Sequence, residues 1–161
     1  MEIKGFKCFD KNLVNHYGAQ FKVGTLYLAE GAIKFGLHGN GFHMCKNLED
    51  TLRYYDAMKE EVKICEVVGS GEIAEYCDDY YGYYDMYAVS DLLITKELTR
   101  EEIIQIGLGL NEVKVCRFLS LYKLSEEEIA LFKKKFEKNL LVQQVIEYYQ
   151  EHQLDAFSRK R

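Results

Sequence analysis

The chain of 161 residues has 26 acidic and 21 basic side chains, a formal net charge of −5, and 48% apolar residues. This composition excludes a disordered chain and predicts one soluble globular domain, or two small ones packed together, and the negative charge argues against generic binding to nucleic-acid backbones. Neither a membrane-spanning apolar run nor a signal peptide is expected, and five cysteines without an export signal predict reduced thiols in the cytoplasm.

The N-terminal part of the chain shows the period-two alternation that is typical of β-strands. Over residues 2–9 this alternation places Lys7 on the same side as Gly5 and Phe9. Further strands are predicted, in chain order, over residues 21–28, 41–45, 62–68, 86–90 and 92–95. The fourth strand is expected to end at Gly69-Ser70-Gly71, because glycine interrupts strands.

Helices are predicted at one place in the N-terminal part and throughout the C-terminal part. Asn47 is expected to cap a helix over about residues 48–55, with its side-chain oxygen accepting the amide of Asp50. After Thr95 the apolar period changes from about two to about 3.6 residues. Helix starts are then predicted at the capping boxes over 99–102 and 125–128, at Asn111, and at about Leu140.

These elements predict an α+β fold. Residues 1–95 are expected to form a mixed or antiparallel sheet with one or two helices. Residues 96–161 are expected to form a bundle of three to four helices packed against it. Each half alone is close to the size at which a core becomes marginal, so a shared core is expected.

An acidic, tyrosine-rich segment is the most distinctive feature of the sequence. Between Lys63 and Lys96 there are seven acids and no base, a formal charge of −7, and residues 76–87 hold six of the thirteen tyrosines. Tyrosine suits recognition surfaces, and carboxylates can occupy a basic groove in place of phosphates. The predicted binding residues are Glu72, Glu75, Asp78, Asp79, Tyr80, Tyr81, Tyr83, Tyr84, Asp85 and Tyr87. The alternative is a half-buried tyrosine cluster with ordinary solvated acids.

Metal and thiol chemistry are weaker interpretations of the histidines and cysteines. His38, His43 and Cys45, with Cys8 or Cys65, offer zinc-type ligands, but no second close pair completes the usual pattern. Buried cysteines and a structural histidine are the favoured interpretation, so neither a metal nor a cofactor is predicted. A Cys–His nucleophile is the other alternative, with Cys45 two residues before a predicted helix cap.

One resemblance covers about residues 3–100. The motifs that carry it are Gly5-Phe6, Gly24-x-x-Tyr27, Gly41-Phe42-His43-x-Cys45-x-Asn47, Glu66-Val67 and Gly71-Glu72-Ile73. In this order they resemble an uncharacterised domain family common in phage and prophage proteins. The resemblance implies a setting in a bacterial mobile element and a location in the cytoplasm of the host cell.

A more distant similarity is to the ADP-ribosyltransferase fold, in which a glycine-aromatic strand leads into a helix. That family uses a His or Arg on an early strand, a Tyr or Ser on the middle strand and a late Glu. Here the early strand offers Lys4 and Lys7, the middle strand offers His43, and Glu72 or Glu75 would be the late acid. The family's triad is therefore not intact, so the similarity implies a shared fold rather than a shared activity.

Two functions follow from these patterns. The first is a non-catalytic interaction module of a phage or mobile element, which inhibits a bacterial nucleic-acid-handling or defence protein by covering its basic surface with the acidic segment. This module would bind neither nucleic acid nor membrane, and its oligomeric state is not indicated. The alternative is an ADP-ribosyltransferase-like, nucleotide-binding enzyme with His43, Cys45 and Glu72 at its site. A pocket open at His43 would favour the alternative.

Overall fold

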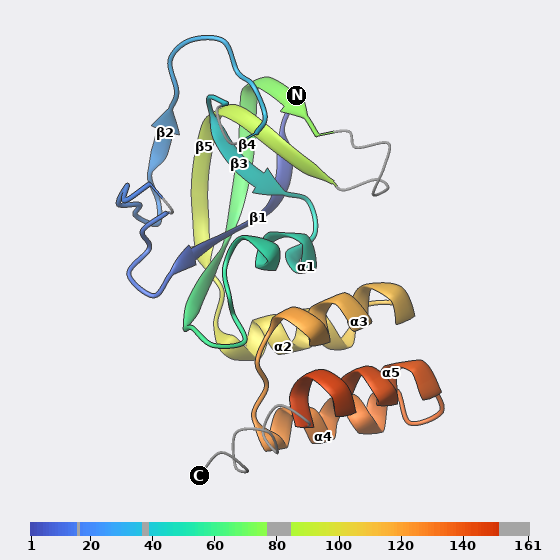
Figure 1. The fold of residues 1–161 in the computed structure, drawn as a ribbon. Coiled ribbons are helices and arrows are strands. Elements are labelled where there is room, and N and C mark those ends of the chain that lie inside the picture. Colours follow the sequence, from blue (N-terminus) through green and yellow to red (C-terminus); the bar gives the residue numbers. More distant parts are fainter. Residues whose placement is uncertain (16, 37–38, 77–84, 152–161) are drawn as a thin grey trace. The chain divides into compact units, whose positions relative to one another are not determined.

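The computed structural model describes residues 1–15, 17–36, 39–76 and 85–151 (Figure 1). The chain divides into two compact units, one formed by residues 1–55 and 60–98 and the other by residues 56–59 and 99–161. An antiparallel sheet lies in the first unit, and helices dominate the second. The predicted α+β class, with a sheet followed by helices, is confirmed.

Five strands form the sheet of the first unit. They are β1 (Ile3–Asp10), β2 (Leu26–Leu28), β3 (Phe42–Cys45), β4 (Val62–Glu75) and β5 (Met86–Glu97). Their order is β2-β5-β3-β1-β4, and β5 also pairs with β4, so four of the strands form a closed ring of antiparallel pairs. β5 is the common element, because it pairs with β2, β3 and β4 (Figure 1).

A buried apolar cluster fills the sheet unit. Its members are Phe9, Phe21, Met44, Cys65, Val67, Val89, Leu92 and Ile94. β1 and β3 approach each other so closely that a Cβ atom at Gly5 would overlap the carbonyl oxygen of Cys45. Only glycine fits there, which explains the Gly5-Phe6 dipeptide on β1.

The strand boundaries correct three of the sequence predictions. β4 does not end at Gly69-Ser70-Gly71, because a bulge shifts its register against β5 between Ser70 and Ile73, and Gly71 supplies the left-handed turn at φ +77°. The two short strands predicted over 86–95 are one strand, β5. The strand predicted over 21–28 is limited to β2, because Gly24 turns the chain at φ +82°.

The helix after Asn47 is shorter than predicted and is capped differently. It consists of α1 (Leu48–Thr51) and the 3-10 helix η1 (Leu52–Tyr54). The side-chain oxygen of Asn47 makes no capping hydrogen bond. Its amide group instead donates to the carboxylates of Asp50, at 3.3 Å, and Asp85, at 3.1 Å. Asn47 therefore ties the start of α1 to the start of β5.

The second unit contains α2 (Arg100–Leu108), α3 (Glu112–Leu121), α4 (Glu126–Lys135), α5 (Leu140–Val145) and the π-helix η2 (Ile146–Glu151). Both predicted capping boxes are present, at Thr99 and at Ser125, and Asn111 caps α3 by accepting the amide of Lys114. Among the described residues, no helix is both long and apolar enough to cross a membrane.

A buried glutamine organises the helical unit. The Gln150 side chain donates to the carbonyl oxygens of Leu119, at 2.6 Å, and Tyr122, at 2.8 Å, and accepts the amide of Leu124, at 3.0 Å. These three backbone groups lie at the end of α3 and in the turn that follows it. One side chain thus satisfies polar groups that the helix end leaves unpaired.

Candidate binding pocket in the sheet unit

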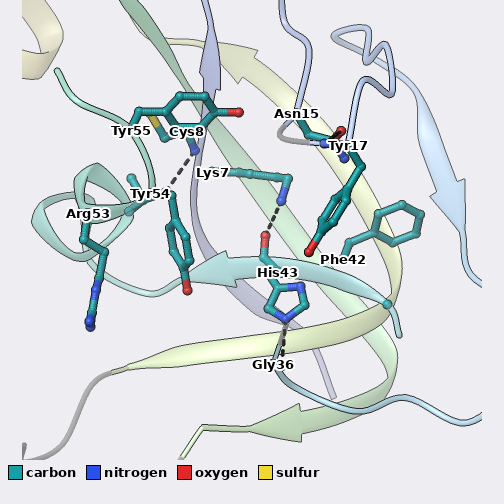
Figure 2. A pocket seen from close by; sticks show the side chains of 12 residues that line it. Lys7, Cys8, Asn15, Tyr17, Gly36, Phe42, His43, Arg53, Tyr54 and Tyr55 are labelled. Atoms are coloured by element: carbon teal, nitrogen blue, oxygen red, sulfur yellow. Dashed lines mark hydrogen bonds between the residues drawn. The ribbon is translucent and has the colours of Figure 1, made fainter. Parts of the chain in front are cut away.

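A pocket of about 540 Å³ lies in the sheet unit (Figure 2). Its lining comes from β1, β3, the α1–η1 turn and the loops after β1 and before β3. The residues that line it are Lys7, Cys8, Asn15, Tyr17, Gly36, Gly41, Phe42, His43, Thr51, Arg53, Tyr54 and Tyr55. This volume is within the range of about 300–1,000 Å³ that is usual for small-molecule sites.

Lys7 is the central cation of the pocket. It lies on β1 between Gly5 and Phe9, on the face that carries the core, and its Nζ lies 5.7 Å from the centroid of the Phe9 ring. Nζ donates a hydrogen bond of 2.6 Å to the carbonyl oxygen of His43 on β3. Burial lowers the pKa of Lys7 to about 8, because the ammonium loses hydration.

His43 lines the pocket on β3 and is half-buried. Its Nε2 accepts the amide of Gly36 at 3.1 Å, so the neutral ring carries its proton on Nδ1. Burial, together with the charge of Lys7, lowers the pKa of His43. The imidazole is therefore neutral at physiological pH. The ring of Phe35 packs against it in a T-shaped arrangement, with 4.7 Å between the two ring centroids.

Aromatic side chains stand on both sides of Lys7. Figure 2 shows Tyr54 and Tyr55 on one side of the lysine and Tyr17 and Phe42 on the other. Burial raises the pKa of Tyr55 to about 12 and also raises that of Tyr54. Both phenols therefore keep their protons at neutral pH, and the walls present uncharged rings to a ligand.

Local hydrogen bonds hold these walls in place. The Thr51 hydroxyl accepts the amide of Cys8 at 2.9 Å, which fixes the α1–η1 turn against β1. The Tyr55 hydroxyl donates to the carbonyl of Val14 at 3.1 Å, and the Asn15 side chain accepts the amide of Tyr17 at 3.0 Å. The pocket is thus built on a strand and short turns that are anchored to it.

The charge of the described lining is opposite to that of the whole chain. Arg53 is permanently charged, and Lys7 is charged in most molecules at neutral pH. No aspartate or glutamate is among the residues that line the pocket within the described ranges. The chain as a whole carries −5. An anionic or electron-rich ligand is therefore favoured here over a cationic one.

The three candidate catalytic residues do not come together. His43 lines the pocket, whereas Cys45 is fully buried and Glu72 is exposed on β4, and neither of these two is part of the described lining. Burial raises the pKa of Cys45 to about 12, so its thiol stays protonated. The ADP-ribosyltransferase analogy pointed to the early strand that holds Lys7. The Tyr54–Tyr55 wall carries no sequence motif, and only the fold reveals it.

The zinc interpretation finds no support in the described part of the chain. Within residues 1–15, 17–36, 39–76 and 85–151, no three His, Cys, Asp or Glu side chains gather closely enough to hold a metal ion. His38 lies outside these residues. The described cysteines, Cys8, Cys45, Cys65 and Cys116, are free thiols.

Much of the acidic, tyrosine-rich segment falls outside the described residues: Asp78, Asp79, Tyr80, Tyr81, Tyr83 and Tyr84. Of the others, Glu72 and Glu75 are exposed on β4. Tyr87 lies opposite Glu75 in the β4–β5 ladder and packs partly against the core. Burial raises the pKa of Tyr87, as do the nearby carboxylates of Asp85 and Glu75. Asp85 also accepts a hydrogen bond from Asn47.

Comparison with known proteins gives one family. A comparison with curated proteins found no match. The profile of a family described as a domain of unknown function (DUF7666) matches residues 3–106, which include every strand of the sheet and every residue of the pocket lining. Because this match covers more than half of the 161 residues, the chain belongs to the DUF7666 family.

Proposed function

We propose that the sheet unit binds a small anionic molecule of nucleotide size in the pocket at Lys7 and His43. The observation that carries this proposal is the described lining, which combines Lys7 and Arg53 with no carboxylate in a chain of net charge −5. A pocket at His43 is also the feature that distinguishes the nucleotide-binding alternative from a purely structural histidine.

The buried ammonium group of Lys7 is the first feature that favours an anionic ligand. Among the described residues, its hydrogen-bond acceptor is the carbonyl oxygen of His43, and an ammonium has three N–H donors. A phosphate or carboxylate at Nζ would restore the interactions that burial removes, and would return the pKa of Lys7 towards its usual value. Ligand binding would thus compensate for the hydration that the Lys7 ammonium loses on burial.

The aromatic walls of the pocket are the second feature, and they favour a ligand with a flat ring. Tyr54 and Tyr55 face Tyr17 and Phe42 across the lysine (Figure 2). Flat rings favour a flat ligand, because stacking adds about 1–3 kcal/mol for each nucleic-acid base that aromatic side chains receive. A purine or pyridine nucleotide, with a ring and a phosphate, matches both the walls and the charge.

The proposal covers binding and leaves out transfer chemistry. In an ADP-ribosyltransferase, the late glutamate must reach the nucleotide, but Glu72 and Glu75 are exposed on β4 and do not line the pocket. The described lining therefore lacks the glutamate that transfer of ADP-ribose would need. The phage or prophage setting that the sequence resemblance implies would supply bacterial nucleotides as candidate ligands.

Calorimetric titration tests the proposal with AMP, NAD and inorganic phosphate as probes. Wild-type protein should bind at least one nucleotide more tightly than phosphate, and Lys7→Met should weaken that binding at least tenfold. Lys4→Met is the matched control, because Lys4 lies on the same strand, is exposed and does not line the pocket. No binding of any probe, or equal binding by folded Lys7→Met, would refute the proposal.

A second candidate function uses the acidic, tyrosine-rich segment. Glu75, Asp85 and Tyr87 lie close enough together for both carboxylates to raise the pKa of the tyrosine, and Glu72 and Glu75 are exposed. We propose that this surface, together with the acids of residues 78–79, covers a basic surface on a bacterial nucleic-acid-handling or defence protein. Such pairing steers association and weakens with salt.

Replacement of Asp78, Asp79 and Asp85 by asparagine tests this candidate. The triple variant should bind a captured bacterial partner several-fold more weakly and with a flatter salt dependence than wild type. Asp56→Asn and Asp91→Asn are controls for the loss of negative charge outside the 72–87 segment. Equal affinity and equal salt dependence of the triple variant would eliminate this function.

A further inference from the structure

We propose that Lys7 is a nucleophilic amine, which forms an imine with a small aldehyde or ketone held in the pocket. This inference rests on the proposed function, because the carbonyl compound must enter the same pocket. It goes further in assigning covalent chemistry to one atom, the Nζ of Lys7.

The placement of the amine is the first support. Lys7 extends from the core-facing side of β1, and Figure 2 shows its Nζ directed between the aromatic walls, with the carbonyl of His43 as its hydrogen-bond acceptor. That acceptor is neutral. No carboxylate is in the described lining, so no negatively charged side chain among these residues favours the charged form of the lysine.

Protonation is the second support. Desolvation lowers the pKa of Lys7 to about 8, whereas an exposed lysine titrates near 10.4. At pH 7, about a tenth of Lys7 is then the neutral amine, against well under a thousandth of an exposed lysine. The titratable groups around it do not compete in this range. Cys8 and Cys45 keep thiols with pKa values of about 12, and His43 is already neutral.

The chemistry needs no oxidant and no further reactant. The electron pair of the neutral Nζ attacks the carbonyl carbon, and the carbon–oxygen π pair moves to oxygen, which takes up a proton as nitrogen releases one. The hydroxyl of the resulting carbinolamine takes up a proton and leaves as water, the nitrogen pair closes the carbon–nitrogen double bond, and the nitrogen releases its remaining proton. Amine and carbonyl give imine and water, and hydrolysis reverses the step.

The pocket also indicates which carbonyl compound to use as a probe. Pyridoxal 5′-phosphate combines a flat ring, a phosphate and an aldehyde. The ring suits the aromatic walls, the phosphate suits Arg53 as the second cation of the lining, and the aldehyde suits the Lys7 Nζ. Pyridoxine 5′-phosphate is its matched control, because an alcohol replaces the aldehyde and no imine can form. The control therefore measures entry into the pocket separately from the covalent step.

The experiment traps the imine at pH 7. Equimolar pyridoxal 5′-phosphate is added, borohydride reduces the imine to a stable secondary amine, and peptide mass spectrometry locates the label among the chain's sixteen lysines. Lys7 should carry at least ten times more label than any other lysine. Lys7→Arg, which keeps the positive charge, should lose this label while its melting temperature shows that it is folded. Lys4→Arg should keep the label at Lys7.

The outcomes separate the two proposals. Label spread over surface lysines without preference for Lys7 overturns the imine, and the pocket proposal survives if pyridoxine 5′-phosphate or AMP still binds. Absence of both label and binding overturns both proposals. Preferential label at Lys7 that free pyridoxine 5′-phosphate competes away supports both.

Discussion

The Nζ of Lys7 lies 2.6 Å from the carbonyl oxygen of His43 and joins β1 to β3, where the ladder between the two strands has a single registered pair, Phe6 with Cys45. A side chain thus contributes to holding two strands together where the backbone contributes little. The same atom is the cation of the pocket. The contact between these two strands and the proposed ligand binding therefore depend on one amine.

The pH dependence of stability should reveal the desolvated state of Lys7. Its pKa is about 8 in the folded protein and near 10.5 when unfolded, so between these values the unfolded state binds more protons and stability rises with pH. Relative to Lys7→Met, wild type should gain about 1–3 kcal/mol between pH 7.5 and pH 10. We expect the lower part of that range, because the side chain is partly exposed. Urea denaturation at the two pH values measures it, and a constant difference would contradict it.

The close approach of β1 and β3 predicts a large effect of Gly5→Ala. The new methyl group would overlap the Cys45 carbonyl and press on Met44, so either the strands separate or the pocket changes shape. We expect a loss of about 2–4 kcal/mol in the free energy of unfolding. Gly109→Ala is the control, because its Cβ would meet only ordinary contacts of 3.5 Å and its φ is −85°. Thermal unfolding of both variants distinguishes them, and equal melting temperatures would count against the predicted overlap.

Gln150 should be one of the most sensitive polar positions of the helical unit. Gln150→Ala would leave the carbonyls of Leu119 and Tyr122 and the amide of Leu124 without their side-chain partner. The expected cost is about 2–4 kcal/mol, measured by chemical denaturation. Gln144→Ala provides the matched control, since Gln144 is exposed on α5. A variant of Gln150 as stable as the Gln144 variant would show that water replaces the lost hydrogen bonds.

The Arg100–Glu128 pair predicts a stability contribution that is lost in acid. Burial alone would raise the pKa of Glu128, but hydrogen bonds from Arg100 and Ser125 outweigh burial and lower it. The pair therefore stabilises the fold above the unfolded pKa of about 4.3, and this stabilisation disappears as the pH falls through the lower folded value. Arg100→Met should cost about 0.5–1 kcal/mol at pH 7 and less at pH 3.

Lys59→Met is the control for that experiment, because the Lys59–Asp56 pair is 4.0 Å long and both side chains are more than half exposed. Its effect should be close to zero at either pH. Guanidinium is unsuitable as denaturant because its salt screens both pairs, so urea melts at the two pH values provide the comparison. A pH-independent cost of Arg100→Met would assign its role to packing and to the hydrogen bonds that Arg100 donates to the Lys123 carbonyl and the Tyr122 hydroxyl.

Local signals explain the parts of the fold that the sequence predicted. Each capping box, at Thr99 and at Ser125, lies within four consecutive residues, so both helix starts could be predicted from the local sequence. Asn47 is the N-cap residue of α1 as predicted, but the predicted hydrogen bond from the Asp50 amide to its side-chain oxygen was wrong, because the Asn47 amide group binds the carboxylates of Asp50 and of Asp85, 38 residues away. The glycines at 69–71 suggested a strand end, yet pairing with β5 carries the strand through the bulge. In both cases the deciding contact is distant along the chain.

The candidate site was predictable only in pieces. Alternation placed Lys7 on the face of Phe9, and the motif that resembles a known family drew attention to His43. The hydrogen bond between Lys7 and His43 joins residues that are 36 positions apart. The position of the Tyr54–Tyr55 wall depends on the packing of the α1–η1 turn against β1, which the Thr51–Cys8 hydrogen bond fixes. The role of the acidic segment as a binding surface stays a prediction, since most of its residues lie outside the described part of the chain.

The dependence of the sheet on β5 has a consequence for biosynthesis. This strand comes last of the five, yet β2, β3 and β4 all pair with it. A nascent chain that has emerged only as far as Asp85 lacks the strand that pairs with β3, so the proposed ligand could bind only after residue 97 has left the ribosome. Truncation before Met86 would accordingly abolish the site rather than trim it.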